Sequence, residues 1–245
     1  MESGLYSMAT AVTARAQALD TIANNLANAN TVGYRAERNV FSSVLADAGT
    51  DNGTPLNKAI NQYGILGETV LDLSQGALQK TGNELDVAIQ GPGYFVVQTA
   101  NGPVYTRNGS FQVSAHGELV TQSGDAVMGE GGTIKLAPGP VSISPDGTIS
   151  SKGAVSGKLH IVEFPESAKL SSLGNSYYSA PAGTAETSTT SDLRQGFVES
   201  SNVNPILGMV ELVTAQRSAE MMQHALAMFS SEMDKTASVD LPKVS

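Results

Sequence analysis

The chain has 245 residues, 40% of them apolar and 15% charged, so it is long enough to bury a sizeable core. Its formal net charge is −9, and no basic run offers the cationic surface that nucleic-acid phosphates or anionic membranes need. The chain has no cysteine, which excludes disulfides and cysteine-bound metals, and no apolar run of about 18 residues. We therefore expect no nucleic-acid partner and no membrane insertion.

Residues 5–26 predict a helix with one apolar seam. Larger apolar residues alternate with alanine along this seam, in heptad spacing: Leu5, Ala9, Val12, Ala16, Leu19, Ala23 and Leu26. A heptad repeat of about three heptads is typical of coiled coils, so this helix, roughly 33 Å long, is expected to pack on a partner. No positively charged stretch precedes an uninterrupted apolar run here, so we expect no cleaved signal peptide.

The predicted helix ends in an asparagine-rich segment. Asn24, Asn25 and Asn28 fall off the seam, on faces from which their amides could form hydrogen bonds with other chains. Gly33 is a candidate left-handed residue that stops the helix. Asparagine at these positions therefore indicates a contact surface or, alternatively, a polar helix end that faces water.

The middle of the chain has the pattern of a β domain. Residues 36–75 give no clear periodicity and are interpreted as a connecting segment. From residue 76 to residue 197, short apolar runs are separated by Gly and Pro, and the sequence at 94–113 predicts three consecutive strands. Pro145, Asp146 and Gly147 predict the turn of a further hairpin.

The C-terminal region predicts a second seamed helix, over residues 205–235. Asn204 is its expected N-cap, and Pro205 fits the first helical turn. Its seam again has heptad spacing: Leu212, Ala215, Ala219, Met222, Leu226, Phe229 and Met233.

These elements predict an α+β fold in which the N- and C-terminal helices pair into a coiled-coil-like domain beside a β-rich middle domain. The helical domain would comprise residues 1–35 and 198–245, the connecting segment residues 36–75, and the β-rich domain residues 76–197. The partner of the seams is left open by the pattern: the helices form a hairpin within one chain, or they pack on other subunits.

The sequence contains no constellation that indicates an active site. The three histidines, His116, His160 and His224, lie far apart and lack the spacing of a helical metal pair. The glycine-rich stretches fit neither a phosphate-binding loop nor a dinucleotide fingerprint. We therefore expect no enzymatic activity, no cofactor and no metal.

Four stretches resemble one known family. "ANNLANANTVGYRAER" at 23–38 is similar to the N-terminal motif of the bacterial flagellar rod and hook family of axial proteins. "GALQKTGNELDVAIQGPGYF" at 76–95 and "YTRNGSF" at 105–111 resemble its central motif. "GFVESSNVNP" at 196–205, with Gln216, Arg217 and Glu220 further on, resembles its C-terminal motif.

The resemblance implies a structural subunit that polymerises through its terminal helices into the tubular drive shaft of the flagellar basal body, the rod that spans the periplasm. It favours a place in the proximal rod over one in the distal rod. It implies that the chain contacts itself and neighbouring rod proteins, and that the flagellar type III export apparatus carries it without a cleaved signal. A secreted β-rich binding module or adhesin is the alternative that composition alone would allow.

The expected assembly surface combines seam residues with polar residues of the two motifs. Its members are Leu5, Val12, Leu19, Asn24, Asn25, Leu26, Asn28, Leu212, Gln216, Arg217, Glu220, Met222, Leu226 and Phe229.

Overall fold

The computed structural model describes residues 2–43, 65–165, 168–181, 184, 187–188 and 191–240. The chain divides into two compact units. The helical unit comprises Met1–Leu26, Arg38–Thr69 and Asn204–Ser245, and the β unit comprises Ala27–Glu37 and Val70–Val203. The chain therefore passes four times from one unit to the other.

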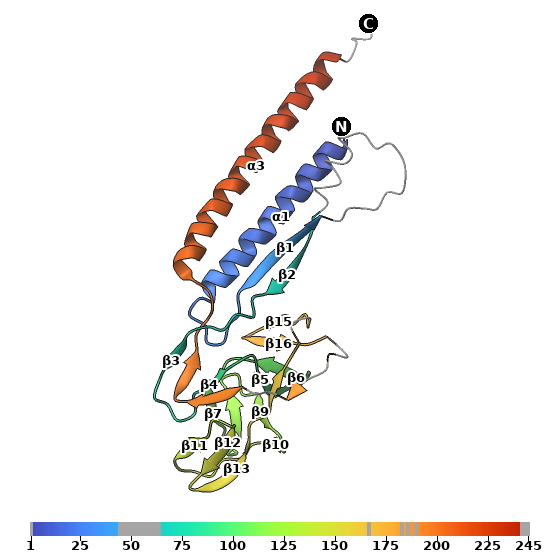
Figure 1. Cartoon of the computed structure of the whole chain (residues 1–245). Helices are drawn as coiled ribbons and strands as arrows, with labels where there is room; N and C mark the ends of the chain where they lie inside the picture. Colours follow the sequence, from blue (N-terminus) through green and yellow to red (C-terminus); the bar gives the residue numbers. More distant parts are fainter. Residues whose placement is uncertain are drawn as a thin grey trace. The chain divides into compact units, whose positions relative to one another are not determined.

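The helical unit contains two long helices and a pair of strands (Figure 1). Helix α1 spans Glu2–Ala27 and helix α3 spans Pro205–Asp240, which correspond to about 39 Å and 54 Å. Strands β1 (Glu37–Ser43) and β2 (Ile65–Leu71) pair with each other and lie within the predicted connecting segment. None of the described helices is long and apolar enough to cross a membrane.

The ends of both helices follow from local chemistry. Beyond α1 the chain turns at Gly33, whose φ of 70° lies in the left-handed region, as the sequence predicts. At the start of α3, the Asn204 side-chain oxygen accepts hydrogen bonds from the backbone N–H groups of Ile206 and Leu207, at 3.0 and 3.2 Å. Asn204 is thus the N-cap and Pro205 the first helical residue, which confirms both predictions.

The predicted α+β fold with coiled-coil-like pairing of the terminal helices is wrong. The described residues contain only two helices, and the fold is mostly β. The α1 seam does not form a continuous buried stripe, because Ala16 and Ala23 are exposed while Ala14, off the seam, is buried. The likeness to a heptad came from alanines that the fold leaves in solvent.

The buried face of α1 is turned instead toward the β1–β2 pair. The Asn39 amide on β1 donates hydrogen bonds to the Gln17 carbonyl (3.3 Å) and to the Thr21 hydroxyl (2.9 Å) of α1. Thr21 is seven residues, about two turns, from Ala14, so both lie on one face of the helix. The Asn39 oxygen in turn accepts a hydrogen bond from the Thr69 hydroxyl on β2, so one side chain joins both strands to α1.

The β unit is built around one large sheet. This sheet has ten strands among the described residues: β5 (Tyr94–Thr99), β6 (Gly102–Thr106), β7 (Phe111–Val113), β8 (Leu119–Thr121), β9 (Ala126–Gly129), β10 (Gly132–Thr133), β14 (Ile161–Glu163), β15 (Ser171–Gly174), β16 (Tyr177–Ser179) and β17 (Thr187–Ser188). Strands β15, β16, β6, β5, β9, β8 and β7 follow one another across it, so β5 is central.

Three smaller groups of strands complete the unit. A three-stranded antiparallel sheet contains β11 (Val141–Ile143), β12 (Thr148–Ser151) and β13 (Ala154–Lys158). Two antiparallel pairs join distant parts of the sequence: β3 (Leu78–Lys80) with β19 (Phe197–Glu199), and β4 (Val87–Gln90) with β18 (Asp192–Gln195). The predicted strands at 94–113 and the hairpin around Asp146 are confirmed as β5 to β7 and as β11 and β12.

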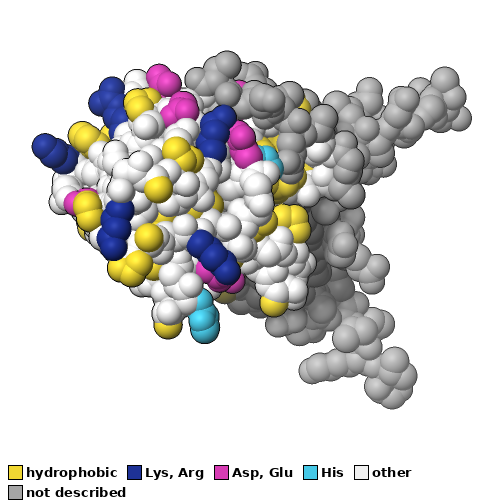
Figure 2. Space-filling model, turned by 90° about the horizontal axis from the view of Figure 1, so that it is seen from below, with side chains coloured by type: hydrophobic (Ala, Val, Ile, Leu, Met, Phe, Trp, Pro, Cys, Tyr) yellow, Lys and Arg dark blue, Asp and Glu magenta, His cyan; other side chains and the backbone are white. Residues whose placement is uncertain are grey.

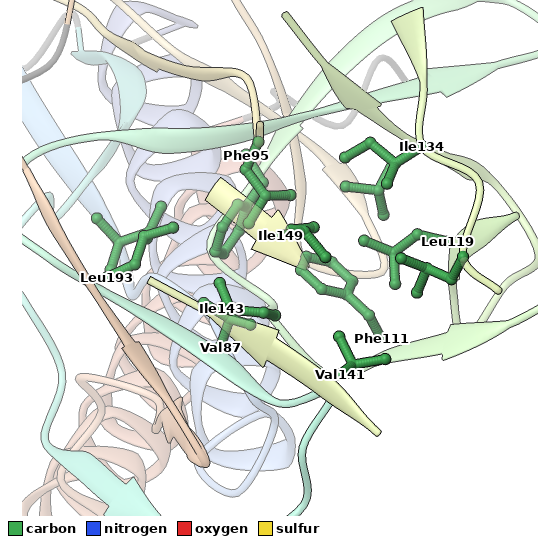
Figure 3. Close-up of a cluster of buried hydrophobic side chains, with 13 residues drawn as sticks. Val87, Phe95, Phe111, Leu119, Ile134, Val141, Ile143, Ile149 and Leu193 are labelled. Atoms are coloured by element: carbon green, nitrogen blue, oxygen red, sulfur yellow. The ribbon is translucent and has the colours of Figure 1, made fainter. Parts of the chain in front are cut away.

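The central strand β5 is buried on both faces, because its alternate side chains enter two different cores. Phe95 and Val97 are fully buried, and Phe95 belongs to the larger core, where its ring meets that of Phe111 edge to face with centroids 5.1 Å apart (Figure 3). Tyr94 and Val96 belong to the smaller core on the other face. Apolar runs such as that of β5 are typical of strands covered on both sides.

Candidate functional site

The predicted assembly residues are spread over both helices. Val12, Leu19 and Leu26 on α1 and Leu212 and Met222 on α3 are half-buried, whereas Gln216, Arg217 and Glu220 are exposed. Asn24 is exposed, and Asn25 and Asn28 are half-buried. The side chains of Leu5, Leu226 and Phe229 lie outside the described residues.

Two of these residues have defined neighbours. A Cβ atom placed on Gly208 of α3 would lie 3.7 Å from Leu26 Cδ1, so the two helices approach each other at this point. The Asn28 side-chain oxygen accepts a hydrogen bond from the Thr31 hydroxyl at 3.1 Å. Asn28 therefore helps to close the end of α1 within its own chain.

Helix α3 exposes an apolar surface that the seam analysis missed. Its members, the α3 apolar surface, are Ile206, Leu207, Met209, Val210, Val213, Met221 and Met228, each between 49% and 77% exposed. Ile206, Val210 and Val213 recur at helical spacing, about half a turn around the helix from Leu212 and Ala215. The signal was therefore present in the sequence, as a second periodic stripe opposite the first.

The exposed face of the β unit in Figure 2 has a different character. Lys and Arg side chains are scattered there among acidic, neutral and apolar ones. Besides Val70 and Leu73, this unit's exposed large apolar residues are Val113, Val155 and Leu173, which come from three different strands. Scattered single residues of this kind need no partner.

The most unusual site in the β unit is a buried ionic cluster. Glu199, at the end of β19, lies 2.5 Å from Arg35 Nη1 through one carboxylate oxygen and 3.3 Å from Arg107 Nη1 through the other. The first oxygen also accepts a hydrogen bond from the Gly76 N–H at 2.9 Å. The side chains of Glu199 and Arg35 are completely buried and that of Arg107 is 2% exposed.

This cluster holds two cations and one anion, so positive charge is in excess. The Arg107 guanidinium also stacks over the Tyr94 ring, 4.7 Å from its centroid. Burial lowers the pKa of Arg107, Glu199 opposes this effect, and Arg35 adds to it. Because a single carboxylate pairs with both buried arginines, Glu199 is the residue on which the cluster depends.

Hydrogen bonds connect the backbone around Gly33 to the same cluster. The Gly33 N–H donates to the Glu199 carbonyl at 2.8 Å, and the Tyr178 hydroxyl donates to the Gly33 carbonyl at 3.1 Å. That hydroxyl also accepts a hydrogen bond from the Arg35 N–H at 2.9 Å. Burial raises the pKa of Tyr178 well above its usual range. A Cβ atom on Gly33 would lie 2.3 Å from the Asn108 nitrogen, so only glycine fits here.

Asn202 forms a second set of contacts next to the cluster. Its side-chain oxygen accepts from the Ala36 N–H at 2.7 Å. Its amide donates to the carbonyls of Asp72 (2.9 Å) and Ser74 (3.1 Å). One asparagine thus joins three segments that are distant in the sequence.

The side chains of this site bind backbone groups of the same chain. The sequence analysis identified only some of these residues. Glu199, Asn202, Gly76 and Arg107 are among the residues that match the family motifs, whereas Arg35 lies in the N-terminal stretch but is not one of the matching positions. A signal for Arg35 was available in the sequence: it is a charged residue directly after Gly33 and Tyr34 of the N-terminal motif, in a chain with few charges. Among the described residues there is no group of three His, Asp or Glu side chains that could hold a metal.

Three family models match the chain. "Flagella basal body rod protein" matches residues 5–35, "Flagellar hook protein FlgE/F/G D1 domain" matches residues 88–156, and "Flagellar basal body rod FlgEFG protein C-terminal" matches residues 194–239.

Full-length relatives agree with these matches. The flagellar basal-body rod protein FlgF of Mesorhizobium japonicum is 38% identical over 226 residues, which cover 90% of each chain. FlgF of Caulobacter vibrioides is 32% identical over 98% of this chain and 100% of its own. FlgG of Bacillus subtilis, also a flagellar basal-body rod protein, is 36% identical over 81% of this chain and 84% of its own.

Proposed function

The chain belongs to the family of flagellar basal-body rod proteins, and we propose that it is a structural subunit of the proximal part of the rod, of the F type. The relatives named FlgF, which it matches over nearly their whole length, support this position. As a rod subunit it contacts further copies of itself or neighbouring rod proteins. Its role is structural, not enzymatic.

The observation that supports assembly through the terminal helices is the α3 apolar surface. Soluble proteins that act alone rarely expose a contiguous apolar stripe, because leaving each such side chain in water forgoes about 1.5–3 kcal/mol of burial. Ile206, Val210 and Val213 lie on one side of α3 and are 77%, 59% and 49% exposed. In the rod, neighbouring subunits cover this stripe.

The polar residues of the predicted assembly surface add specificity to this contact. Asn24 and Asn25 near the end of α1, and Arg217 and Glu220 on the exposed side of α3, are groups that can donate and accept hydrogen bonds between equivalent subunits. We expect Asn25→Ala to reduce rod assembly and to leave the β unit folded. Normal swimming of a strain carrying this variant would contradict the role of Asn25.

The route to the rod follows from the same proposal. The subunit leaves the cytoplasm through the flagellar type III export apparatus without a cleaved signal peptide, and it joins the rod in the periplasm. Isolated helices gain little stability without tertiary packing, so α1 and α3 acquire most of theirs on assembly. Amide hydrogen exchange of the monomer tests this: residues 5–26 should exchange much faster than residues 85–165.

The experiment that tests the function is electron microscopy of basal bodies from a strain that lacks the gene. Rods that end early and carry no hook are expected, and the wild-type gene supplied in trans should restore them. The length of the remaining rod distinguishes a proximal from a distal position. Intact hook–basal bodies would contradict the proposal and would favour a secreted binding module.

A further inference from the structure

The segments that carry the chain between the two units all converge on Glu199 and Asn202. The passage segments, as we call them, are residues 27–37, 70–77 and 199–203. Glu199 contacts Gly33 and Arg35 in the first of them and Gly76 in the second. Asn202 adds Ala36 from the first segment and Asp72 and Ser74 from the second.

Backbone pairing reinforces this convergence. The Asp72 N–H donates to the Ala36 carbonyl at 2.8 Å, and the Ser200 N–H donates to the Ala77 carbonyl at 2.9 Å. A Cβ atom on Gly76 would lie 1.9 Å from the Ser200 carbonyl oxygen, so these two segments touch at their backbones. The places where the chain leaves the β unit toward α1 and α3 are thereby fixed with respect to each other.

The two arginines of the cluster differ in one respect. Both are buried and both pair with Glu199, but only Arg35 lies on a passage segment. Arg107 directly follows β6 in the large sheet. The Arg35–Glu199 pair therefore joins the segment that follows α1 to the segment that precedes α3, whereas the Arg107–Glu199 pair anchors the latter to the sheet.

We propose that Arg35 is a positioning residue for assembly: through Glu199 it holds the segment after α1 and the segment before α3 in one fixed arrangement. This inference rests on the proposed function, because a helical polymer requires every copy to present its contact surfaces in equivalent geometry. A loose connection would leave the rest of the β unit folded but would vary the spacing between residues 27–37 and residues 199–203 among the copies. Arg35 acts through Glu199 and itself touches no neighbouring subunit, since its side chain is fully buried.

The test compares Arg35→Met with Arg107→Met. Each variant removes one buried cation and leaves one arginine paired with Glu199, so the change in charge is the same and the remaining ion pair is balanced. Near-UV circular dichroism of the tyrosines in the β unit verifies that both variants fold. If Arg35→Met does not fold, Arg35→Lys and Arg107→Lys provide the same comparison with the charge retained.

The first readout is a distance within the β unit. The chain has no cysteine, so Asn30→Cys, within the first passage segment, and Val203→Cys, at the end of the third, accept spin labels without further changes. Double electron–electron resonance measures the distance between the two labels. The distribution of this distance should be narrow for the otherwise wild-type chain and for Arg107→Met, and broad for Arg35→Met. Equal widths for the two variants would overturn the proposal.

The second readout is swimming of a strain that lacks the gene and carries each variant without labels. We expect Arg107→Met to restore swimming and Arg35→Met to fail. If the strain that lacks the gene already swims, the proposed function is refuted, and the distance measurement remains valid. If Arg35→Met swims as well as Arg107→Met, Arg35 has no positioning role.

Discussion

The two units of this protein treat their apolar side chains in opposite ways. The β unit places them in two cores on either side of β5, where Phe95, Val127 and Ile149 are inaccessible to solvent. The helical unit leaves them outside: of the thirteen large apolar side chains that are exposed among the described residues, seven lie on α3. By our proposal, neighbouring subunits in the rod supply this burial to α3.

This difference separates stability from assembly. Substitutions in the β unit are expected to act on the free energy of unfolding, because its contacts are complete within one chain. Substitutions on the exposed side of α3 are expected to act on polymerisation and to leave the monomer unchanged. The tyrosines allow the β unit to be followed by itself, since five of the seven, Tyr34, Tyr94, Tyr105, Tyr177 and Tyr178, belong to it.

The largest effect on stability is expected from Glu199→Gln. The substitution leaves two buried arginines without a carboxylate, and an uncompensated buried charge typically costs about 3–5 kcal/mol. The unfolding transition of the β unit, followed by tyrosine circular dichroism in urea, should shift strongly to lower denaturant. Glu130→Gln is the control, because it breaks the exposed pair of Glu130 with Lys158, and it should behave like the wild type. Similar curves for the two variants would show that the cluster does not stabilise the β unit.

A smaller loss of stability is expected from Gly109→Ala, which tests how tightly the β unit is packed. The added Cβ atom would lie 1.7 Å from the Val87 carbonyl oxygen, so the backbone must move, at a cost of about 1–3 kcal/mol. Gly131→Ala is the matched control, since a Cβ atom there meets nothing within 4 Å. Thermal unfolding of both variants should give a clear decrease for the first only. An unchanged transition for Gly109→Ala would mean that the core is more adaptable than its contacts suggest.

The sequence predicted the local structure of both units better than their packing. The strands at 94–113, the turn at Asp146, the N-cap Asn204 and the left-handed Gly33 each depend on one or two residues, and all were found. The predicted coiled-coil pairing is wrong because a heptad repeat rich in alanine indicates which face of a helix is less polar, but it does not indicate which element packs against that face. Hydrogen bonds from Asn39 settle that question for α1, and they depend on a strand pair that periodicity did not reveal.

The site followed the same division. The residues of the family motifs were identified from the sequence, but their convergence was not, because Arg35, Gly76, Arg107 and Glu199 come from four separate segments. Long-range pairing of single charges leaves no periodic signal in one sequence. The second stripe on α3 does leave one, in the helical spacing of Ile206, Val210 and Val213.

The pH dependence of stability offers a further test of the β unit. Burial raises the pKa of Tyr178 above the value of about 10 expected in the unfolded chain, so above pH 10 the unfolded state loses this proton first and stability falls as pH rises. Tyr178→Phe should reduce this slope by up to about 1.4 kcal/mol per pH unit. The variant also loses hydrogen bonds to Gly33 and Arg35 at neutral pH, so the diagnostic quantity is the slope between pH 10 and 12. An unchanged slope would mean that Tyr178 ionises as easily in the folded protein as in the unfolded one.

The smallest effect on stability, and the sharpest test of the comparison between the units, is expected from Val210→Ser on the α3 apolar surface. Val210 is 59% exposed, so the unfolding free energy of the monomer should change by no more than about 0.5 kcal/mol. Leu173→Ser is the matched control, because Leu173 on β15 is 58% exposed but has no apolar stripe around it. A strain that carries Leu173→Ser should swim, and one that carries Val210→Ser should not, although both monomers are equally stable. If both strains swim, the exposed apolar side chains of α3 are no more required for assembly than those of the β unit. If neither swims, both units contribute surfaces to the rod, and the division between a unit that folds and a unit that assembles must be abandoned.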